Sequence, residues 1–224
     1  MSRKSILVTI VSIDLIAIVI ALILGKTPGQ YFGERYPMTY LSSFQLLVIS
    51  GLAWKIFVMR LDESRLKFWK GPFFIWLIVA MTFMYLSLDE VGSIHEKIDF
   101  FIHRFFKIRE TGLTDRIDDV IVGCYGLIGL MVLYLFREEL KKYREAFPLL
   151  TVGFIFMFSM VTLDILTGRK DILRILISNA YVVNRLQLWL SAIEDMFKII
   201  AEGAFLVGFY YCLEITRRLR SKSI

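Results

Sequence analysis

The sequence predicts an all-α protein, a polytopic membrane helical bundle with about six transmembrane helices. Three observations lead to this fold class. Hydrophobic residues make up 57% of the 224-residue chain, more than the roughly half found in soluble domains. They are gathered into long runs, each close to or above the ~17–25 residues that a helix needs to cross the hydrocarbon of a bilayer. Short segments rich in Lys and Arg separate several of these runs.

The predicted spans follow one another along a single integral membrane domain. The first contains Asp14 as its only charge, the second Lys55 and the fifth Asp164; the third and fourth have uncharged cores, and the sixth contains several charges. The spans cover about residues 5–25, 38–59, 72–92 extending to about 107, 116–136, 147–168 and 186–216. Two further segments, "FFIHRFFKIRE" and "DILRILISNAYVVNR", are amphipathic and are expected at the outer interface or as caps of the bundle.

The distribution of Lys and Arg predicts the orientation. An N-terminus inside the cell places fourteen basic loop residues in the cytoplasm and eleven outside, and the richer side is normally cytoplasmic. We therefore expect a multi-pass protein of the plasma (cytoplasmic) membrane, which is the cell inner membrane, with both termini in the cytoplasm. The net charge of +6 is then expected to serve topology and attraction to the lipid bilayer, and not the binding of nucleic acid. Protein partners stay unknown.

Acidic residues gather towards the outer side of four predicted spans. Because ionisable groups are costly at membrane depth, those facing a bundle interior are default candidates for function. The predicted polar cavity comprises Tyr85, Asp89, Ser93, His95, Glu96, Asp99, His103, Asp119, Asp164, Glu194, Asp195, Lys198 and Glu202. Asp14 is the exception, because it lies towards the inner side.

Helical geometry organises the third span. At 100° per residue, a row that continues the inward-facing seam is formed by Thr82, Tyr85, Asp89, Gly92, Glu96, Asp99 and His103. Glu90 and Lys97 fall on the opposite side, as expected for a helix that emerges into water. A structural alternative is open, in which residues 94 to 111 form an extramembrane helix with a solvated face. The sixth span has its own alternative, an ion-pair ladder of Glu194, Lys198 and Glu202.

The segment "HEKID" indicates a divalent metal site. It has the frame of H-E-x-x-H with Asp in the second ligand position. His95, Asp99 and His103 would face one ion, and Glu96 would activate a bound water as the catalytic residue. Further metal ligands are expected among Asp89, Asp195 and Glu202. Histidine together with carboxylates suits Zn, Fe or Mn.

Two family resemblances rest on short blocks. "LSLDEVGSIHE" resembles an L-S-L-D-E-x-x-x-x-H-E signature of uncharacterised prokaryotic multi-span membrane proteins, which often also have an acid pair on the last helix, as "IEDMFKIIAEG" does. That resemblance implies a membrane bundle and no known activity. "EDMFK" is similar to the E-E-x-x-K block of PrsW-like membrane metalloproteases, with Asp195 in place of the second Glu and without a downstream histidine motif. This second resemblance implies a metal-dependent enzyme.

The leading functional prediction is a membrane protein with an acidic and histidine-containing, cation-binding cavity open to the outer side. As an enzyme it would be a metal-dependent hydrolase of a lipid-linked or membrane-embedded substrate. One alternative is a proton- or cation-coupled transporter or channel, with Asp14, Glu202 and Asp89 as successive polar positions across the bilayer. Another is a membrane scaffold or assembly factor without chemistry.

Overall fold

The structure, a computed structural model, describes residues 3–33, 36–63, 71–106, 117–167, 173 and 177–222. These residues are helical or lie in turns, and none of them forms a strand. The helices are α1 (Arg3–Leu24), α2 (Pro37–Glu63), α3 (Phe74–Gly92), α4 (Ile94–Phe106), α5 (Ile117–Leu135), α6 (Arg137–Leu140), the 3-10 helix η2 (Lys141–Ala146), α7 (Phe147–Thr167) and α9 (Ala180–Ser221). The prediction of an all-α fold is confirmed.

Five helices of the described chain are long and apolar enough to cross a membrane. They lie within Lys4–Leu24, Pro37–Asp62, Phe74–Gly92, Arg137–Ile165 and Ala180–Ser221, and a shorter apolar helix covers Gly126–Leu135. Each of the six predicted spans therefore coincides with a helix, and five of them meet the length and hydropathy needed for spanning.

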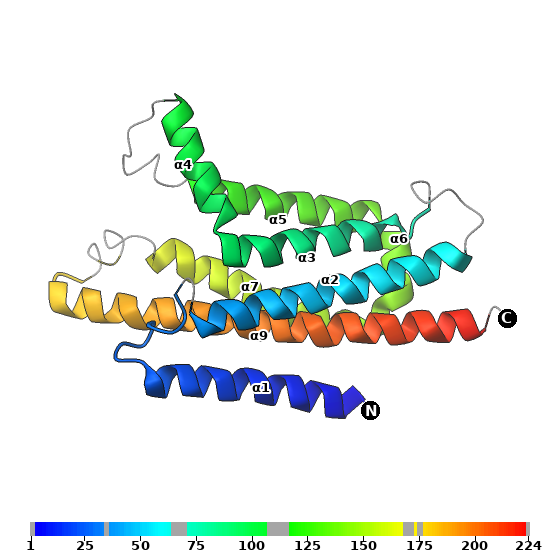
Figure 1. The fold of residues 1–224 in the computed structure, drawn as a ribbon, viewed down its shortest axis with the longest axis horizontal. Coiled ribbons are helices and arrows are strands. Elements are labelled where there is room, and N and C mark those ends of the chain that lie inside the picture. The colour runs from blue at the N-terminus through cyan, green and yellow to red at the C-terminus, as the bar shows by residue number, and fades with distance from the viewer. Residues whose placement is uncertain are drawn as a thin grey trace.

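The long helices run back and forth along one axis (Figure 1). The chain termini lie at the same end of the bundle, where α1 begins and α9 ends. At the opposite end α1 leads into α2, α3 leads into α4, and α9 begins.

Helix α9 is the centre of the bundle. Its 42 residues correspond to about 63 Å at about 1.5 Å per residue, so α9 is about twice as long as the hydrocarbon core is thick. Helices α1, α2 and α7 pack against it, and α3 packs on α2. Glycines allow the closest approach, because a Cβ at Gly153 would meet the Phe205 ring and one at Gly208 would meet the Leu150 side chain.

The core at the end of the bundle where both chain termini lie is apolar and aromatic. The Trp76 ring packs edge-on against Tyr143 with centroids 4.6 Å apart, and Phe209 contacts both Trp76 and Phe83. At the margin of this core, the buried carboxylate of Glu139 accepts a hydrogen bond from Arg60 Nε at 3.0 Å. The terminal half of the bundle is thus closed by packed rings and an ion pair.

The structure corrects two boundaries. The third span does not extend as one helix to about residue 107, because α3 ends at Gly92 and α4 starts at Ile94. The sixth helix begins earlier than residue 186, because the Asn179 side chain caps the amide nitrogens of Tyr181 and Val182. The last part of the amphipathic segment "DILRILISNAYVVNR" is therefore the first turn of α9.

Candidate functional site

The corner between α3 and α4 organises the "LSLDEVGSIHE" motif. Ser93 adopts a left-handed conformation, with φ 45° and ψ 51°, and this ends α3. The Asp89 carboxylate accepts hydrogen bonds from the backbone nitrogen of His95 at 2.8 Å and pairs with the His95 ring Nδ1 at 2.9 Å. The first turn of a helix has unsatisfied N–H groups, so Asp89 acts as a cap for α4. Asp89 and His95, both assigned to the predicted cavity, are in direct contact with each other, and they hold a corner of the chain.

Ser87 fixes the same segment to α2. Its hydroxyl donates to the carbonyl oxygen of Ser43 at 2.8 Å, and the Ser43 hydroxyl donates to the carbonyl oxygen of Ser87 at 2.9 Å. Such reciprocal bonds replace water for groups that the bundle buries. The corner is therefore anchored to a second helix directly before Asp89.

The predicted polar face of the third span is wrong in three respects. The break at Ser93 separates α4 from the helical phase of α3, so the row cannot continue from Asp89 to His103. Thr82, at the start of the row, is exposed. Glu90, assigned to the solvated side, points into the bundle and forms an ion pair with Lys198 at 2.7 Å.

Lys198 of α9 joins acids from two helices. Its ammonium donates to Glu90, with side-chain exposures of 27% for Lys198 and 18% for Glu90. Asp195 and Glu202 are also close enough to interact electrostatically with it. The hydrogen-bond partner of Lys198 is thus Glu90 of α3. The predicted ion-pair ladder of Glu194, Lys198 and Glu202 along α9 does not account for this hydrogen bond.

A second polar group lies deeper, where α1, α2 and α9 meet. Gln45 Nε2 donates to Asp14 Oδ1 at 2.5 Å, and the Ser42 hydroxyl donates to Glu202 Oε1 at 2.7 Å. All four residues are buried, with Asp14 3% and Glu202 6% exposed. We call Asp14, Ser42, Gln45 and Glu202 the buried carboxyl cluster. The cluster places Asp14 beside Glu202 of α9, although its position along the sequence puts Asp14 towards the inner side, apart from the other acids.

Gly203 allows α1 and α9 to approach each other closely at Asp14. A Cβ at Gly203 would collide with Asp14 Oδ2 and lie 3.4 Å from the Ile10 side chain. Because Glu202 is the neighbouring residue in α9, the Asp14 carboxyl group lies near the Glu202 side chain, and the two carboxyl groups interact electrostatically. The absence of a side chain at position 203 is thus what lets α1 bring its single acid into the cluster.

Two acceptors of the buried carboxyl cluster lack a hydrogen-bond donor among the described residues. They are Gln45 Oε1 and Glu202 Oε2, and both are inaccessible to solvent. Buried polar atoms are nearly always hydrogen-bonded, and each exception calls for a physical explanation. Two unsatisfied acceptors beside two carboxyl groups indicate a position for a donor or a cation.

The remaining predicted site residues are dispersed. His103 is buried on α4, while Tyr85, Asp164 and Glu194 are half-buried. Asp164 of α7 lies within electrostatic reach of Asp195. The side chains of Glu96, Asp99 and Asp119 lie outside the described part of the structure.

The described side chains do not form the predicted metal centre. Among them, no group of three or more His, Cys, Asp or Glu is placed to hold one metal ion. Of the predicted metal ligands, Asp89 of α3 and His95 of α4 are brought together, and His103 lies further along α4. Asp195 and Glu202 belong instead to the surroundings of Lys198. The roles of Glu96 and Asp99 stay predictions.

The sequence reasoning missed Ser42, Gln45 and Glu90. A signal was present for the first two, because Ser42 and Gln45 are three residues apart on an otherwise apolar span and so share one face of a helix. Thr39 extends this polar row by one more turn, and it too is buried. A polar stripe within a predicted span marks the face towards the bundle interior.

Comparison with known proteins adds a family and no activity. No curated protein and no solved structure matches the chain. One family model, the domain of unknown function DUF8692, matches residues 6–213 and thus covers most of the chain. The chain belongs to the DUF8692 family.

Proposed function

We propose that this protein is an integral membrane protein that binds a proton or a small cation at the buried carboxyl cluster and couples that binding to transport. In this proposal the chain crosses the plasma membrane six times, with both termini in the cytoplasm. Five helices long enough to span, the shorter apolar helix Gly126–Leu135, the shared location of the termini and the surplus of basic residues at that end support this topology.

The observation that carries the proposal is the pair of unsatisfied acceptors in the cluster. Glu202 Oε2 and Gln45 Oε1 are buried without a donor among the described residues. Around them, the ammonium group of Lys198 interacts with three carboxyl groups, those of Glu90, Asp195 and Glu202, and the Asp14 carboxyl group lies near Glu202. A buried carboxylate without compensation is costly. A proton or a small cation bound at Glu202 offsets the excess charge and supplies the partner that Glu202 Oε2 lacks.

Access from the outer side follows from the order of polar groups along α9. Lys198 with Glu90 lies nearer the end where α9 begins, Glu202 follows one turn later, and Asp14 meets α9 at Gly203. Beyond this point the core consists of packed rings, among them Phe205 and Phe209. The polar path therefore reaches from the outer end to the cluster, and an apolar barrier separates the cluster from the cytoplasmic end.

Coupling to movement rests on the position of Asp14. Helix α1 packs against α9 and α2, and most of its large hydrophobic residues are exposed. Its only buried acid is the residue that meets Gln45 and Gly203. Occupation of the cluster therefore changes the contact that holds α1 to the bundle, and a ligand shifts a conformational equilibrium by its differential affinity for two states.

The metal-dependent hydrolase stays a prediction of the sequence. The geometry of the described residues favours the transport hypothesis over it, because the acids are divided between the α3–α4 corner and the buried carboxyl cluster. The membrane scaffold has no specific observation in its favour.

The test is electrical. Purified protein in liposomes is adsorbed to a solid-supported membrane, and rapid jumps of pH, Na⁺ or K⁺ are applied at constant ionic strength. We expect a transient charge displacement for one of these ions in the wild type. Glu202→Gln removes the charge with little change of shape, so it should abolish the displacement, and Asp14→Asn should reduce it.

Asp62→Asn is the matched control. Asp62 is an exposed acid at the cytoplasmic end of α2, with a weak contact to Arg220 at 3.9 Å. This variant should retain the displacement of the wild type. The proposal fails if no ion produces a displacement in the wild type, or if Glu202→Gln leaves the displacement unchanged.

A further inference from the structure

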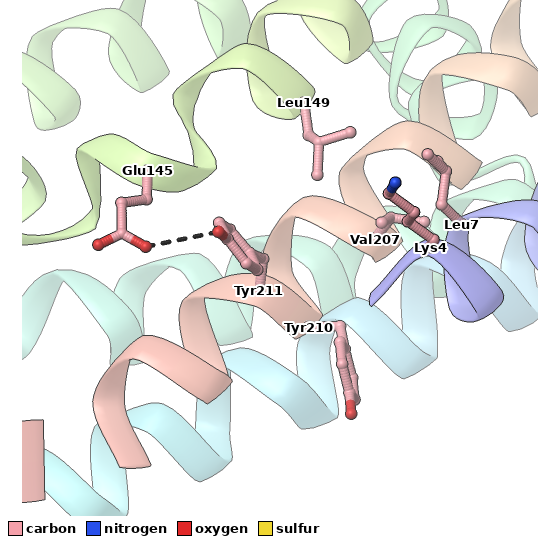
Figure 2. Close-up of a pocket in the computed structure, with 7 residues that line it drawn as sticks. All are labelled: Lys4, Leu7, Glu145, Leu149, Val207, Tyr210 and Tyr211. Carbon is pink, nitrogen blue, oxygen red and sulfur yellow. Dashed lines mark hydrogen bonds between the residues drawn. The ribbon is translucent and has the colours of Figure 1, made fainter. Parts of the chain in front are cut away.

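A groove opens between the first turns of α1 and α7, over the cytoplasmic half of α9. It has a volume of about 220 Å³, and its lining includes Lys4, Leu7, Leu149, Val207, Tyr210 and Tyr211. Figure 2 shows these side chains arranged along the three helices. Helices α1 and α7 both pack against α9, and the groove lies between them.

The groove has an apolar floor and a basic end. Leu7, Leu149 and Val207 provide the floor, and each lies in a helix that is apolar enough to cross a membrane. Lys4 provides the positive charge, and no described acid forms an ion pair with it. A groove with this pattern suits an amphiphile with a hydrocarbon part and an anionic part.

The one acid at the groove is already engaged. Glu145 accepts hydrogen bonds from Arg218 at 3.0 Å and from the Tyr211 hydroxyl at 3.4 Å, and Figure 2 shows Tyr211 turned towards it. Because Arg218 neutralises Glu145, the charge of Lys4 is not cancelled within the groove. Arg217 and Arg220 add positive charge at the same end of α9.

The size of the groove argues against a free soluble ligand. Pockets for small molecules usually measure about 300–1,000 Å³ and enclose most of the ligand, whereas this groove is smaller and open on one side. An acyl chain that enters from the bilayer needs only one wall of protein, because neighbouring lipids cover its other side. The cytoplasmic leaflet, which is rich in anionic lipids, meets Lys4 at this depth.

We propose that this groove binds an anionic glycerophospholipid of the cytoplasmic leaflet, with an acyl chain along Leu7, Leu149 and Val207 and the phosphate at Lys4. The inference rests on the membrane insertion that is part of the proposed function, and it is independent of ion binding at the buried carboxyl cluster. The lipid would connect α1 to α7, which both pack against α9.

The test measures which lipid stays bound. The protein is reconstituted into vesicles of equimolar phosphatidylglycerol and phosphatidylcholine, extracted with a mild detergent and analysed by native mass spectrometry. We expect the wild type to retain phosphatidylglycerol in preference to phosphatidylcholine. Lys4→Gln should lower this retention about fivefold, the factor that corresponds to about 1 kcal/mol for one basic residue at an anionic surface.

Two further variants separate the groove from general charge and from misfolding. Leu149→Trp fills the floor and should reduce the retention of both lipids. Lys55→Gln removes an exposed lysine of α2 that does not line the groove, and it should behave as wild type. Thermal unfolding of each variant identifies a folding defect, and Lys4→Gln, at an exposed position, tests the groove even if Leu149→Trp unfolds.

The proposal is overturned if the wild type retains both lipids equally, if Lys4→Gln retains as much phosphatidylglycerol as wild type, or if Lys55→Gln loses as much as Lys4→Gln. It is also overturned if a folded Leu149→Trp variant retains both lipids in full. Flotation of the vesicles tests insertion separately, so that a failure of the proposed topology is distinguished from a failure of the lipid site.

Discussion

Gly203 offers the sharpest test of the buried carboxyl cluster, because adding a single methyl group at this position would produce a collision with the Asp14 carboxyl group. In Gly203→Ala the new Cβ meets Asp14 Oδ2, and the Asp14 Cγ lies 3.3 Å away. Asp14 cannot swing aside freely, since its Oδ1 accepts the hydrogen bond of Gln45 at 2.5 Å. The substitution therefore cannot preserve both the close packing of α1 on α9 and the hydrogen bond that Gln45 of α2 donates to Asp14 of α1.

The expected change in the free energy of unfolding of Gly203→Ala has three contributions. Overpacking of a filled site costs about 1–3 kcal/mol, and loss of a hydrogen bond to a carboxylate costs about 1.5–3 kcal/mol. Alanine gains about 1 kcal/mol of helix propensity over glycine. Gly203→Ala should thus lower the free energy of unfolding by about 1.5–5 kcal/mol. Gly51→Ala is the matched control, because a Cβ at Gly51 meets nothing within 4 Å, and this variant should be at least as stable as wild type.

The assay is an SDS titration of purified protein in mixed micelles, followed by tryptophan fluorescence. Asp14→Ala removes the oxygen that the new methyl group would meet, so Gly203→Ala should cost little in that background. We expect a coupling energy of at least about 1 kcal/mol between the two positions in a double-mutant cycle. The reasoning is refuted if Gly203→Ala is as stable as Gly51→Ala, or if the effects at positions 14 and 203 are additive.

Two other contacts give predictions of the same kind. A double-mutant cycle with Glu90→Gln and Lys198→Met should give a coupling of about 1.5–3 kcal/mol, because the pair is largely buried and truncation leaves one charge uncompensated; a coupling below about 0.5 kcal/mol would contradict a direct ion pair. Asp89→Ala should cost about 0.5–2 kcal/mol through loss of the cap on α4 and should speed amide hydrogen exchange at His95. Lys97→Ala, at an exposed position of α4, should leave that exchange unchanged, and equal rates in Asp89→Ala and wild type would show that Asp89 does not hold the corner.

The positions of the helices could be predicted because the signal for each is local. A run of apolar residues and its flanking charges lie within one segment of the chain, and backbone hydrogen bonds in a helix join residues only four apart. For this reason α2 and α7 begin within one residue of the predicted spans. The predicted sixth span is shorter than α9 because Asn184, Arg185 and Gln187 interrupt the apolar run and the start of the helix depends on the Asn179 cap.

The α3–α4 corner shows where local reasoning ends. Periodicity assigns Asp89 and His95 to one face of a continuous helix, whereas in the structure they meet across the break between α3 and α4. The left-handed turn at Ser93 changes the helix phase, so the faces assigned before and after residue 93 are unrelated. A single residue with positive φ, followed by a helix start that the Asp89 carboxylate caps, is invisible to a periodicity argument.

The sequence by itself determined the all-α class, the course of the long helices and the presence of costly acids within them. Only the tertiary structure decided which acids meet. Ser42 and Glu202 are 160 residues apart in the chain, and Gln45 and Asp14 are 31 apart. The physical reason is that a carboxyl group on an apolar helix must find a partner on another helix, and the choice depends on helix rotation, on depth and on a glycine that permits close approach. Those quantities arise only when the bundle is assembled.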